Sequence, residues 1–139
     1  MSSLYAFLHP IKLQEEKEIV ISKRFRDENG DIVPFKIRSL SQEENDTITK
    51  KSRKAIKTPT GMQEKFDALE YNKRLIVAAT ITPDFANKEL CEHFGVLDPL
   101  LVPGKMLLPG EYTTLLSAIE ALSGFAENED EKEDETVKN

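Results

Sequence analysis

The residues best suited to nucleophilic or metal chemistry in this 139-residue chain are one cysteine, Cys91, and two histidines, His9 and His93. Cys91 and His93 stand two apart in a segment predicted to be helical, and residues two apart on a helix do not face each other. They therefore cannot share a metal ion or act as a nucleophile and its base, and we interpret them as structural. His9, beside Pro10, is interpreted as a surface residue. The sequence predicts no catalytic, cofactor-binding or metal-binding residue and indicates a protein that is not an enzyme.

The sequence also lacks the usual patterns for phosphate and calcium binding. No Gly-rich loop of the dinucleotide-binding or P-loop type occurs. The acidic run Asp27–Asp31 resembles the start of a calcium loop, but Arg38 stands at the twelfth position, where such a loop needs a glutamate. A tight turn between two strands is favoured instead, because Asn29-Gly30 tolerates positive φ.

A basic cluster occupies residues 50–57, with cations at Lys50, Lys51, Arg53, Lys54 and Lys57. One interpretation is a phosphate-binding patch, which would make the protein a small DNA-directed or host-directed regulator. We favour a solvated helix end, because the cations complement the helix dipole and because no aromatic side chains lie between them, as they would in a nucleic-acid-binding patch. A DNA gel shift separates the two interpretations, because phosphate contacts make binding steeply dependent on salt.

Charge is distributed unevenly along the chain. Residues 126–139 hold seven acidic residues against two lysines, a net of −5, while the formal net charge of the chain is −6. The first 125 residues are therefore nearly neutral, which argues against general binding of nucleic acid. The acidic segment has little to bury and is predicted to be disordered. We divide the chain into one domain, 1–125, and an acidic tail, 126–139.

The sequence contains no candidate for membrane insertion or export. No basic region followed by an apolar stretch opens the chain, and its longest apolar runs, such as Leu75–Ala79, are far too short to cross a bilayer. We expect a soluble, cytoplasmic protein without a membrane partner.

Residues 18–38 have the pattern of a β-hairpin, in which apolar and polar side chains alternate with the period of a half-buried strand. The apolar positions are Ile19, Ile21 and Phe25 on the first arm and Val33, Phe35 and Ile37 on the second. Lys23 interrupts the first arm and predicts a bulge or an exposed strand end there. Pro34 either begins the second arm or places it at a sheet edge, because proline donates no ladder hydrogen bond.

Helices are predicted to cover this hairpin, which would be marginal alone. Ser41-Gln42-Glu43-Glu44 has the spacing of a capping box and opens a helix that runs to about Lys57. A loop at 58–61 precedes a second helix over about 63–80, and a short helix covers 88–94. The last helix covers 111–123, and its apolar stripe is Tyr112, Leu115, Leu116, Ile119 and Leu122. The expected fold is α+β, an N-terminal β-hairpin packed against about three to four helices.

Two apolar stretches lie outside these elements. Residues 4–8 (Leu-Tyr-Ala-Phe-Leu) are expected to form one helical turn docked on the body; the alternative is a peptide that binds a partner. Residues 97–108 are rich in leucine and broken by prolines. Any part of this second stretch that stays exposed would mark a binding surface.

Several stretches together resemble the XkdN-like family of tail assembly chaperones from long-tailed phages and PBSX-type prophages. They are Phe7-Leu8, Ser22-Lys23-Arg24-Phe25, Asn29-Gly30, Val33-Pro34-Phe35, Ile37-Arg38, Glu43-Glu44, Met106-Leu107-Leu108-Pro109-Gly110-Glu111-Tyr112 and Gly124-Phe125. The stretch 106–112 is the most specific, and the set covers residues 4–125 in the family's order and spacing.

The resemblance implies a non-catalytic protein of the bacterial host's cytoplasm that is absent from the mature virion and needs no cofactor. Its implied partners are the tape-measure protein, whose aggregation-prone helices it would coat, and the tail tube protein, whose subunits it would help to recruit. Contact of a helix with an apolar groove is the expected mode of binding. Leu107, Leu108 and Tyr112 are our candidates for the partner-binding residues, and the same side chains suit a core equally well.

Tail chaperones of this broad class are often made in two lengths, the longer through a minus-one ribosomal slip. Val137-Lys138-Asn139 can be encoded by a heptamer that permits such a slip, A-AAA-AAC or A-AAA-AAT. On this hypothesis the acidic run Glu127–Glu135 is a self-repelling spacer between the chaperone body and a second domain.

Overall fold

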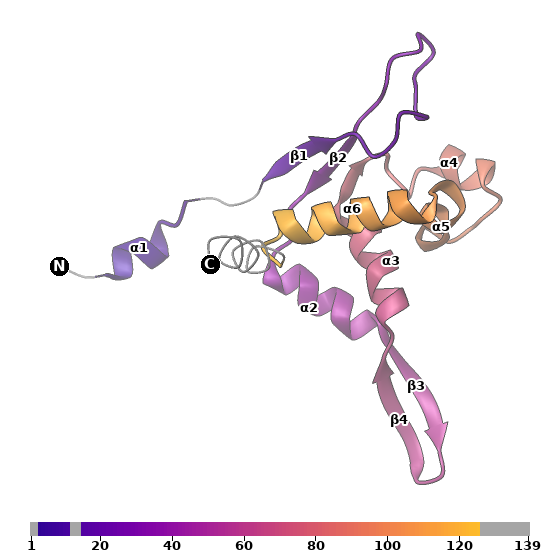
Figure 1. Cartoon of the computed structure of the whole chain (residues 1–139). Helices are drawn as coiled ribbons and strands as arrows, with labels where there is room; N and C mark the ends of the chain where they lie inside the picture. Colours follow the sequence, from indigo (N-terminus) through magenta and orange to yellow (C-terminus); the bar gives the residue numbers. More distant parts are fainter. Residues whose placement is uncertain (1–2, 12–14, 126–139) are drawn as a thin grey trace, which may run out of the picture.

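The computed structural model describes residues 3–11 and 15–125 (Figure 1). Its larger sheet is antiparallel and consists of β1 (Glu16–Ile19), β2 (Phe35–Arg38) and β5 (Thr80–Thr82), with β2 in the middle. Ile19 lies opposite Phe35. The predicted pairing of the two arms of 18–38 is therefore confirmed, and so is the α+β class.

The arms of this hairpin are shorter than the sequence predicts. Residues 20–34, called here the β1–β2 loop, leave the ladder, and an isolated bridge between Arg26 and Ile32 pairs the two sides within the loop. Asp27 closes the turn, because its Oδ1 accepts hydrogen bonds from the backbone N–H groups of Asn29 and Asp31 at 2.9 and 3.0 Å. Pro34 directly precedes β2, a central strand, so it begins the second arm and does not place it at an edge.

The core lies between one face of the sheet and the helices α2 (Gln42–Lys51), α3 (Ala68–Ala79) and α6 (Pro109–Leu122). Burial alternates along β2, as a strand with one covered face requires. The buried apolar side chains from these elements are Phe35, Ile37, Ile48, Leu75, Ile76, Ala79, Leu115 and Ile119. Tyr112, Leu116 and Leu122 pack against them, which confirms the stripe predicted for the last helix.

The largest departure from the predicted fold concerns residues 52–67. The predicted capping box begins α2, where Ser41 Oγ accepts from the Glu44 N–H at 3.1 Å, but α2 ends at Lys51 and not at Lys57. The chain then forms a second hairpin from β3 (Arg53–Thr58) and β4 (Gly61–Phe66). The predicted helix over 63–80 consequently starts only at Ala68, where Asp67 is its cap.

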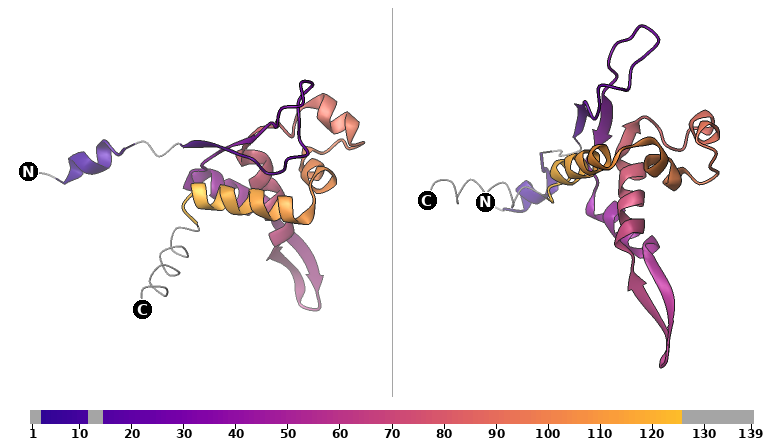
Figure 2. Two further views of the ribbon diagram at one scale, coloured as in Figure 1. Left: turned by 45° about the horizontal axis from the view of Figure 1, so that its top comes forward. Right: turned by 45° about the vertical axis from the view of Figure 1, so that its right-hand side comes forward.

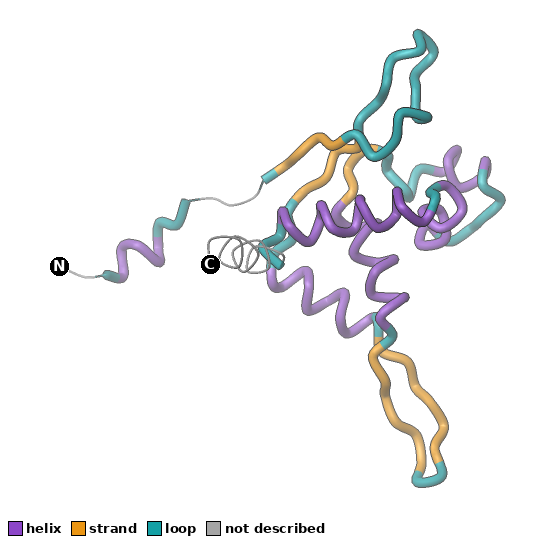
Figure 3. Tube along the Cα trace, viewed as in Figure 1, coloured by secondary structure: helices purple, strands orange, loops and turns teal. Residues whose placement is uncertain are grey.

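The β3–β4 hairpin projects from the body, as the orange strands in Figure 3 and both views in Figure 2 show. None of its twelve strand positions is buried. Its attachment is local: the Asp67 N–H donates to the Ser52 carbonyl at 2.7 Å, and the Phe66 and Tyr71 rings lie 5.5 Å apart. The basic cluster predicted to be a helix end is therefore divided between the end of α2 and β3.

The remaining described elements are short. The helix predicted over 88–94 is confirmed as α4 (Lys88–His93), and η1 (Pro99–Leu101) and α5 (Val102–Met106) lead into α6. The α1 helix (Leu4–Leu8) has no buried residue and lies apart from the body in Figure 1 and in the left view of Figure 2. The predicted docking of residues 4–8 on the body is therefore wrong, whereas the prediction of a disordered tail over 126–139 lies outside the described residues.

Candidate partner-binding surface

Two of the stretches that carry the family resemblance meet at an ion pair between the β1–β2 loop and α6. Arg24 donates from Nε and Nη2 to the two carboxylate oxygens of Glu111, at 2.9 and 2.6 Å. Its Nη2 also donates to the Met106 carbonyl at 2.6 Å, and its guanidinium lies 4.4 Å from the centre of the Phe25 ring. A bidentate arginine–carboxylate contact restricts the relative orientation of the two side chains and is stronger than a single hydrogen bond, so it holds the loop against the start of α6.

The same carboxylate helps to begin α6. Glu111 Oε1 accepts from the Leu108 N–H at 2.8 Å, one turn before it, while Pro109 occupies the first turn of the helix. Hydrogen bonds from Arg24, then from the Leu108 backbone, hold the pKa of Glu111 at about 2, against the opposing effect of burial. The most specific stretch of the resemblance, 106–112, therefore has a structural task that the sequence does not reveal.

The structure does not bring the three predicted partner-binding residues to one exposed face. Leu107 is buried and belongs to the core. Tyr112 is half-buried against the core, and burial raises the pKa of its hydroxyl. Leu108 is 58% exposed. Contact of these residues with a partner stays a prediction, in which Leu108 is the one of the three with an exposed apolar side chain.

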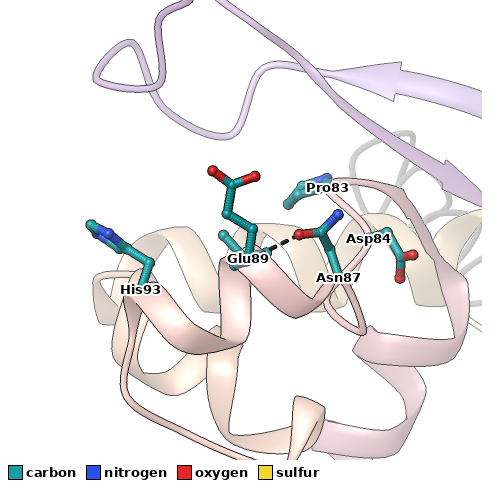
Figure 4. A pocket seen from close by; sticks show the side chains of 6 residues that line it. Pro83, Asp84, Asn87, Glu89 and His93 are labelled. Carbon is teal, nitrogen blue, oxygen red and sulfur yellow. Dashed lines mark hydrogen bonds between the residues drawn. The ribbon is translucent and has the colours of Figure 1, made fainter.

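An apolar hollow lies beside the Arg24–Glu111 pair. Its volume is about 120 Å³, and its lining includes Phe25, Pro34, Phe35, Pro83 and Met106. Pro83 also borders an open groove of about 410 Å³ along α4, shown in Figure 4. Three stretches of the resemblance thus converge on one small apolar recess that has an open groove next to it.

The groove along α4 does not gather a catalytic set. Its polar lining is Asp84, Asn87, Glu89 and His93, and the hydrogen bond drawn in Figure 4 runs from the Leu90 N–H to Asn87 Oδ1 at 3.0 Å, a helix cap. Cys91 turns away from it: the thiol is buried and donates to the Phe85 carbonyl at 3.3 Å. This arrangement suits contact with another surface.

Two further findings restrict the chemistry of residues 3–11 and 15–125. No group of three or more His, Cys, Asp or Glu side chains in this part converges as a metal site would. None of the helices described is long and apolar enough to span a bilayer.

The most exposed apolar helix is α1. The exposed fractions of Leu4, Tyr5, Phe7 and Leu8 range from 57% to 78%, and Ile11 follows at 88%. The Tyr5 and His9 rings stack at 4.3 Å, which leaves the leucine and phenylalanine side chains as the apolar surface. A grouped apolar surface of this kind is typical of a binding segment. The alternative interpretation of residues 4–8, a partner-binding peptide, is the one that this exposure favours.

The β3–β4 hairpin is a second exposed element, and sequence reasoning missed it. A hollow of about 230 Å³ lies at its base between strand and helix residues, including Lys54, Ile56, Lys65, Phe66 and Leu69. The signal that could have revealed the hairpin is Thr58-Pro59-Thr60-Gly61, a turn sequence between arms of equal length.

Comparison with known proteins gives a family match over nearly the whole chain. The family described as "Phage XkdN-like tail assembly chaperone protein, TAC" matches residues 4–138. The "Phage-like element PBSX protein XkdN" of Bacillus subtilis (strain 168) is 32% identical over 124 residues, which are 87% of this chain and 83% of that protein.

A second relative has a solved structure. The "Uncharacterized protein YqbN" of Bacillus subtilis (strain 168) is 34% identical over 128 residues, 90% of this chain and 85% of that protein. The crystal structure of the protein YqbN matches this fold with a TM-score of 0.72 and 31% identity, over 86% of this chain and 95% of that one.

Proposed function

This chain belongs to the phage XkdN-like family of tail assembly chaperones, and from that premise we propose that it binds the tape-measure protein and helps to recruit tail tube subunits around it. The binding is non-catalytic and takes place in the cytoplasm of the bacterial host, before the virion is complete. The groove along α4 and the exposed α1 helix supply surfaces for contact and no reaction chemistry.

The observation that carries this proposal is the exposure of α1. The α1 helix presents Leu4, Phe7 and Leu8 to solvent. Burial of these side chains against a partner would stabilise the complex by about 25 cal/mol per Å² of apolar surface removed from water. A tape-measure protein with long apolar helices is a partner that gains in the same contact. Covering those helices prevents their association with one another, which is the task of a chaperone.

Leu108 is the second proposed contact. It lies at the start of α6, next to the buried Leu107, and the ion pair of Glu111 fixes the backbone around it. In this proposal Leu107 and Tyr112 hold the surface in place from below, and Leu108 touches the partner.

Co-expression with the tape-measure protein tests the proposal. The unaltered chain keeps the tape measure in the soluble fraction, and the double variant F7S/L8S loses most of that effect because it removes the apolar surface of α1. The matched control is L97S, which changes a leucine that is fully exposed in the loop after α4. Neither change touches the core, so all three chains fold alike by circular dichroism.

Three results speak against the proposal. Tape measure that aggregates equally with and without the chain contradicts chaperone binding itself. An F7S/L8S variant as effective as the unaltered chain removes α1 from the contact, and an L97S variant as weak as F7S/L8S shows that any exposed leucine suffices. The variant L108S measures the second contact by the same assay, with a smaller expected loss because it removes one side chain.

A further inference from the structure

The β3–β4 hairpin and the end of α2 form the most basic surface of the described chain. Between residues 50 and 66 there are six cations and one acid, Glu64, a net charge of +5. The cations are Lys50, Lys51, Arg53, Lys54, Lys57 and Lys65. We call residues 50–66 the basic hairpin. The rest of residues 1–125 carries a net charge of −6, but the strands of the hairpin project away from that body (Figure 3).

These cations have few anionic partners among the residues that the structure describes. Lys54 pairs with Asp67 at 3.2 Å, and the other five form no ion pair with any described side chain. Lys54 also stands directly opposite Lys65 in the ladder. Like charges opposite each other across a ladder are destabilising, so the hairpin gains from an anion placed against it.

The chain carries a segment of matching charge. Residues 126–139 have a net charge of −5, equal in size and opposite in sign to that of the basic hairpin. Their acids are Glu127, Glu129, Asp130, Glu131, Glu133, Asp134 and Glu135. With so few apolar side chains, this segment can bind a surface mainly through charge.

The segment starts close enough to reach the hairpin. Ser123, at the end of α6, accepts a hydrogen bond from the Leu40 N–H at 3.0 Å, which ties the end of α6 to the start of α2 (Figure 1). The ten residues of α2 extend about 15 Å from there, and the strands of the hairpin about 20 Å more. Residues 126–139 can extend about 45 Å, at about 3.3 Å per residue.

We propose that the acidic segment 126–139 docks on the basic hairpin of its own chain. Docked there, it neutralises the exposed cations and keeps the hairpin from binding nucleic acid through its phosphates. The contact is reversible and sensitive to salt, because it joins solvent-exposed charges. This inference is independent of the proposed tape-measure contact, which uses α1 and Leu108.

Paramagnetic broadening in the full chain tests the docking. A nitroxide is attached at T136C in a C91A background, and the amide signals of 53–66 are compared with those of α4. At low salt the hairpin signals broaden and the α4 signals do not; near 1 M salt, where the Debye length is about 3 Å, the broadening is lost. The variant K57Q/K65Q loses it at low salt, whereas the matched variant K88Q/K105Q, which removes two exposed cations outside the hairpin, keeps it.

Other occupants of the surface are separate outcomes. Unbroadened hairpin signals at low salt, or equal broadening over the whole body, overturn the proposal. In a second sample, chains without the nitroxide are mixed with chains that carry it. Broadening of the hairpin signals of the nitroxide-free chains assigns the surface to a second copy of the chain and also overturns the proposal. Tight binding of a DNA duplex by the full chain at physiological salt, abolished by K57Q/K65Q, assigns the surface to nucleic acid and also overturns the proposal.

The unaltered chain supplies a measurement that needs no substitution. If the docking occurs, raising the salt concentration shifts the amide signals of 53–66 and of 127–135 together, with a common midpoint. Signals of the two segments that respond at different salt concentrations, or a hairpin that does not respond, overturn the proposal even if the C91A background fails to fold.

Discussion

The β1–β2 hairpin and the β3–β4 hairpin share an antiparallel pairing but have opposite surroundings. In the first, β2 buries Phe35 and Ile37, gains β5 as a third strand, and lies under α6. In the second, every strand position is exposed or half-exposed, and the sheet has two strands. A two-stranded sheet without a covered face is marginal in water, so the second hairpin depends on its anchors at Ser52 and Asp67.

The difference separates the residues that hold the fold from those that are available to a partner. Elements that bury apolar side chains form the body, while α1 and the β3–β4 hairpin contain no buried residue and project from it (Figure 2). We therefore expect substitutions in the two classes of element to act on different properties, stability in the first and binding in the second.

The largest expected effect comes from one substitution made in both hairpins. Ile37→Ala in β2 should lower the free energy of unfolding by about 2–5 kcal/mol, because it leaves a cavity at a fully buried site. Ile56→Ala in β3 should lower it by much less, because Ile56 is still 37% exposed and its hairpin has no covered face. Urea unfolding measures both, and equal losses would contradict the division between body and projection.

Ion pairs give a second matched test, by acid unfolding. The pKa of Glu111 is held at about 2, below its ordinary value of 4.5, so its contribution is fully present above about pH 4.5 and is lost as the pH falls toward 2. Glu111→Gln should lower the melting temperature at pH 7 and flatten its decline below pH 4.5. Lys54→Gln breaks the Lys54–Asp67 pair at the exposed hairpin. It should have a smaller effect on the melting temperature at pH 7 and on the decline of the melting temperature in acid. A larger effect of Lys54→Gln would show that the hairpin is part of the cooperative fold.

The sequence predicts the first hairpin because its burial leaves a pattern. Phe35 and Ile37 alternate with Lys36 and Arg38, and that period of two follows from one face being covered. The strands β3 and β4 have no covered face and so no such period. Their residues are mostly Lys, Arg, Gln, Glu, Met and Ala, which favour helices, and the cations matched the end of a helix dipole. The turn at Pro59 and Gly61 is the remaining signal, and it fits a loop between two helices equally well.

The candidate site could be predicted only in part, for a related reason. The sequence of 106–112 does not indicate which of its apolar side chains are buried. In the structure Leu107 is buried and Leu108 is exposed. Long-range contacts decide the difference: Arg24 pairs with Glu111, 87 positions away, and that pairing sets the backbone between Met106 and Glu111. No local pattern contains this information.

Hydrogen exchange should separate the two hairpins without any substitution. Amides of β2 are expected to exchange only on global unfolding, because the strand is central and its face is covered. Amides of β3 and β4 should exchange through local opening, at a lower free energy. Equal protection in both hairpins would mean that the β3–β4 hairpin opens only with the body.

The smallest expected effect concerns the acidic segment. Deleting residues 127–139 should leave the melting temperature within a few degrees of its original value, because exposed charge contacts contribute at most about 1 kcal/mol and the segment has little apolar surface to bury. If the segment docks on the basic hairpin, its loss should still speed amide exchange in β3 and β4 at low salt while β2 is unchanged. The deletion therefore sharpens the comparison between the hairpins: a charge contact at the projection changes local opening and spares the core. A melting temperature that falls by many degrees would place the segment in the body of the fold, and faster exchange in β2 would do the same.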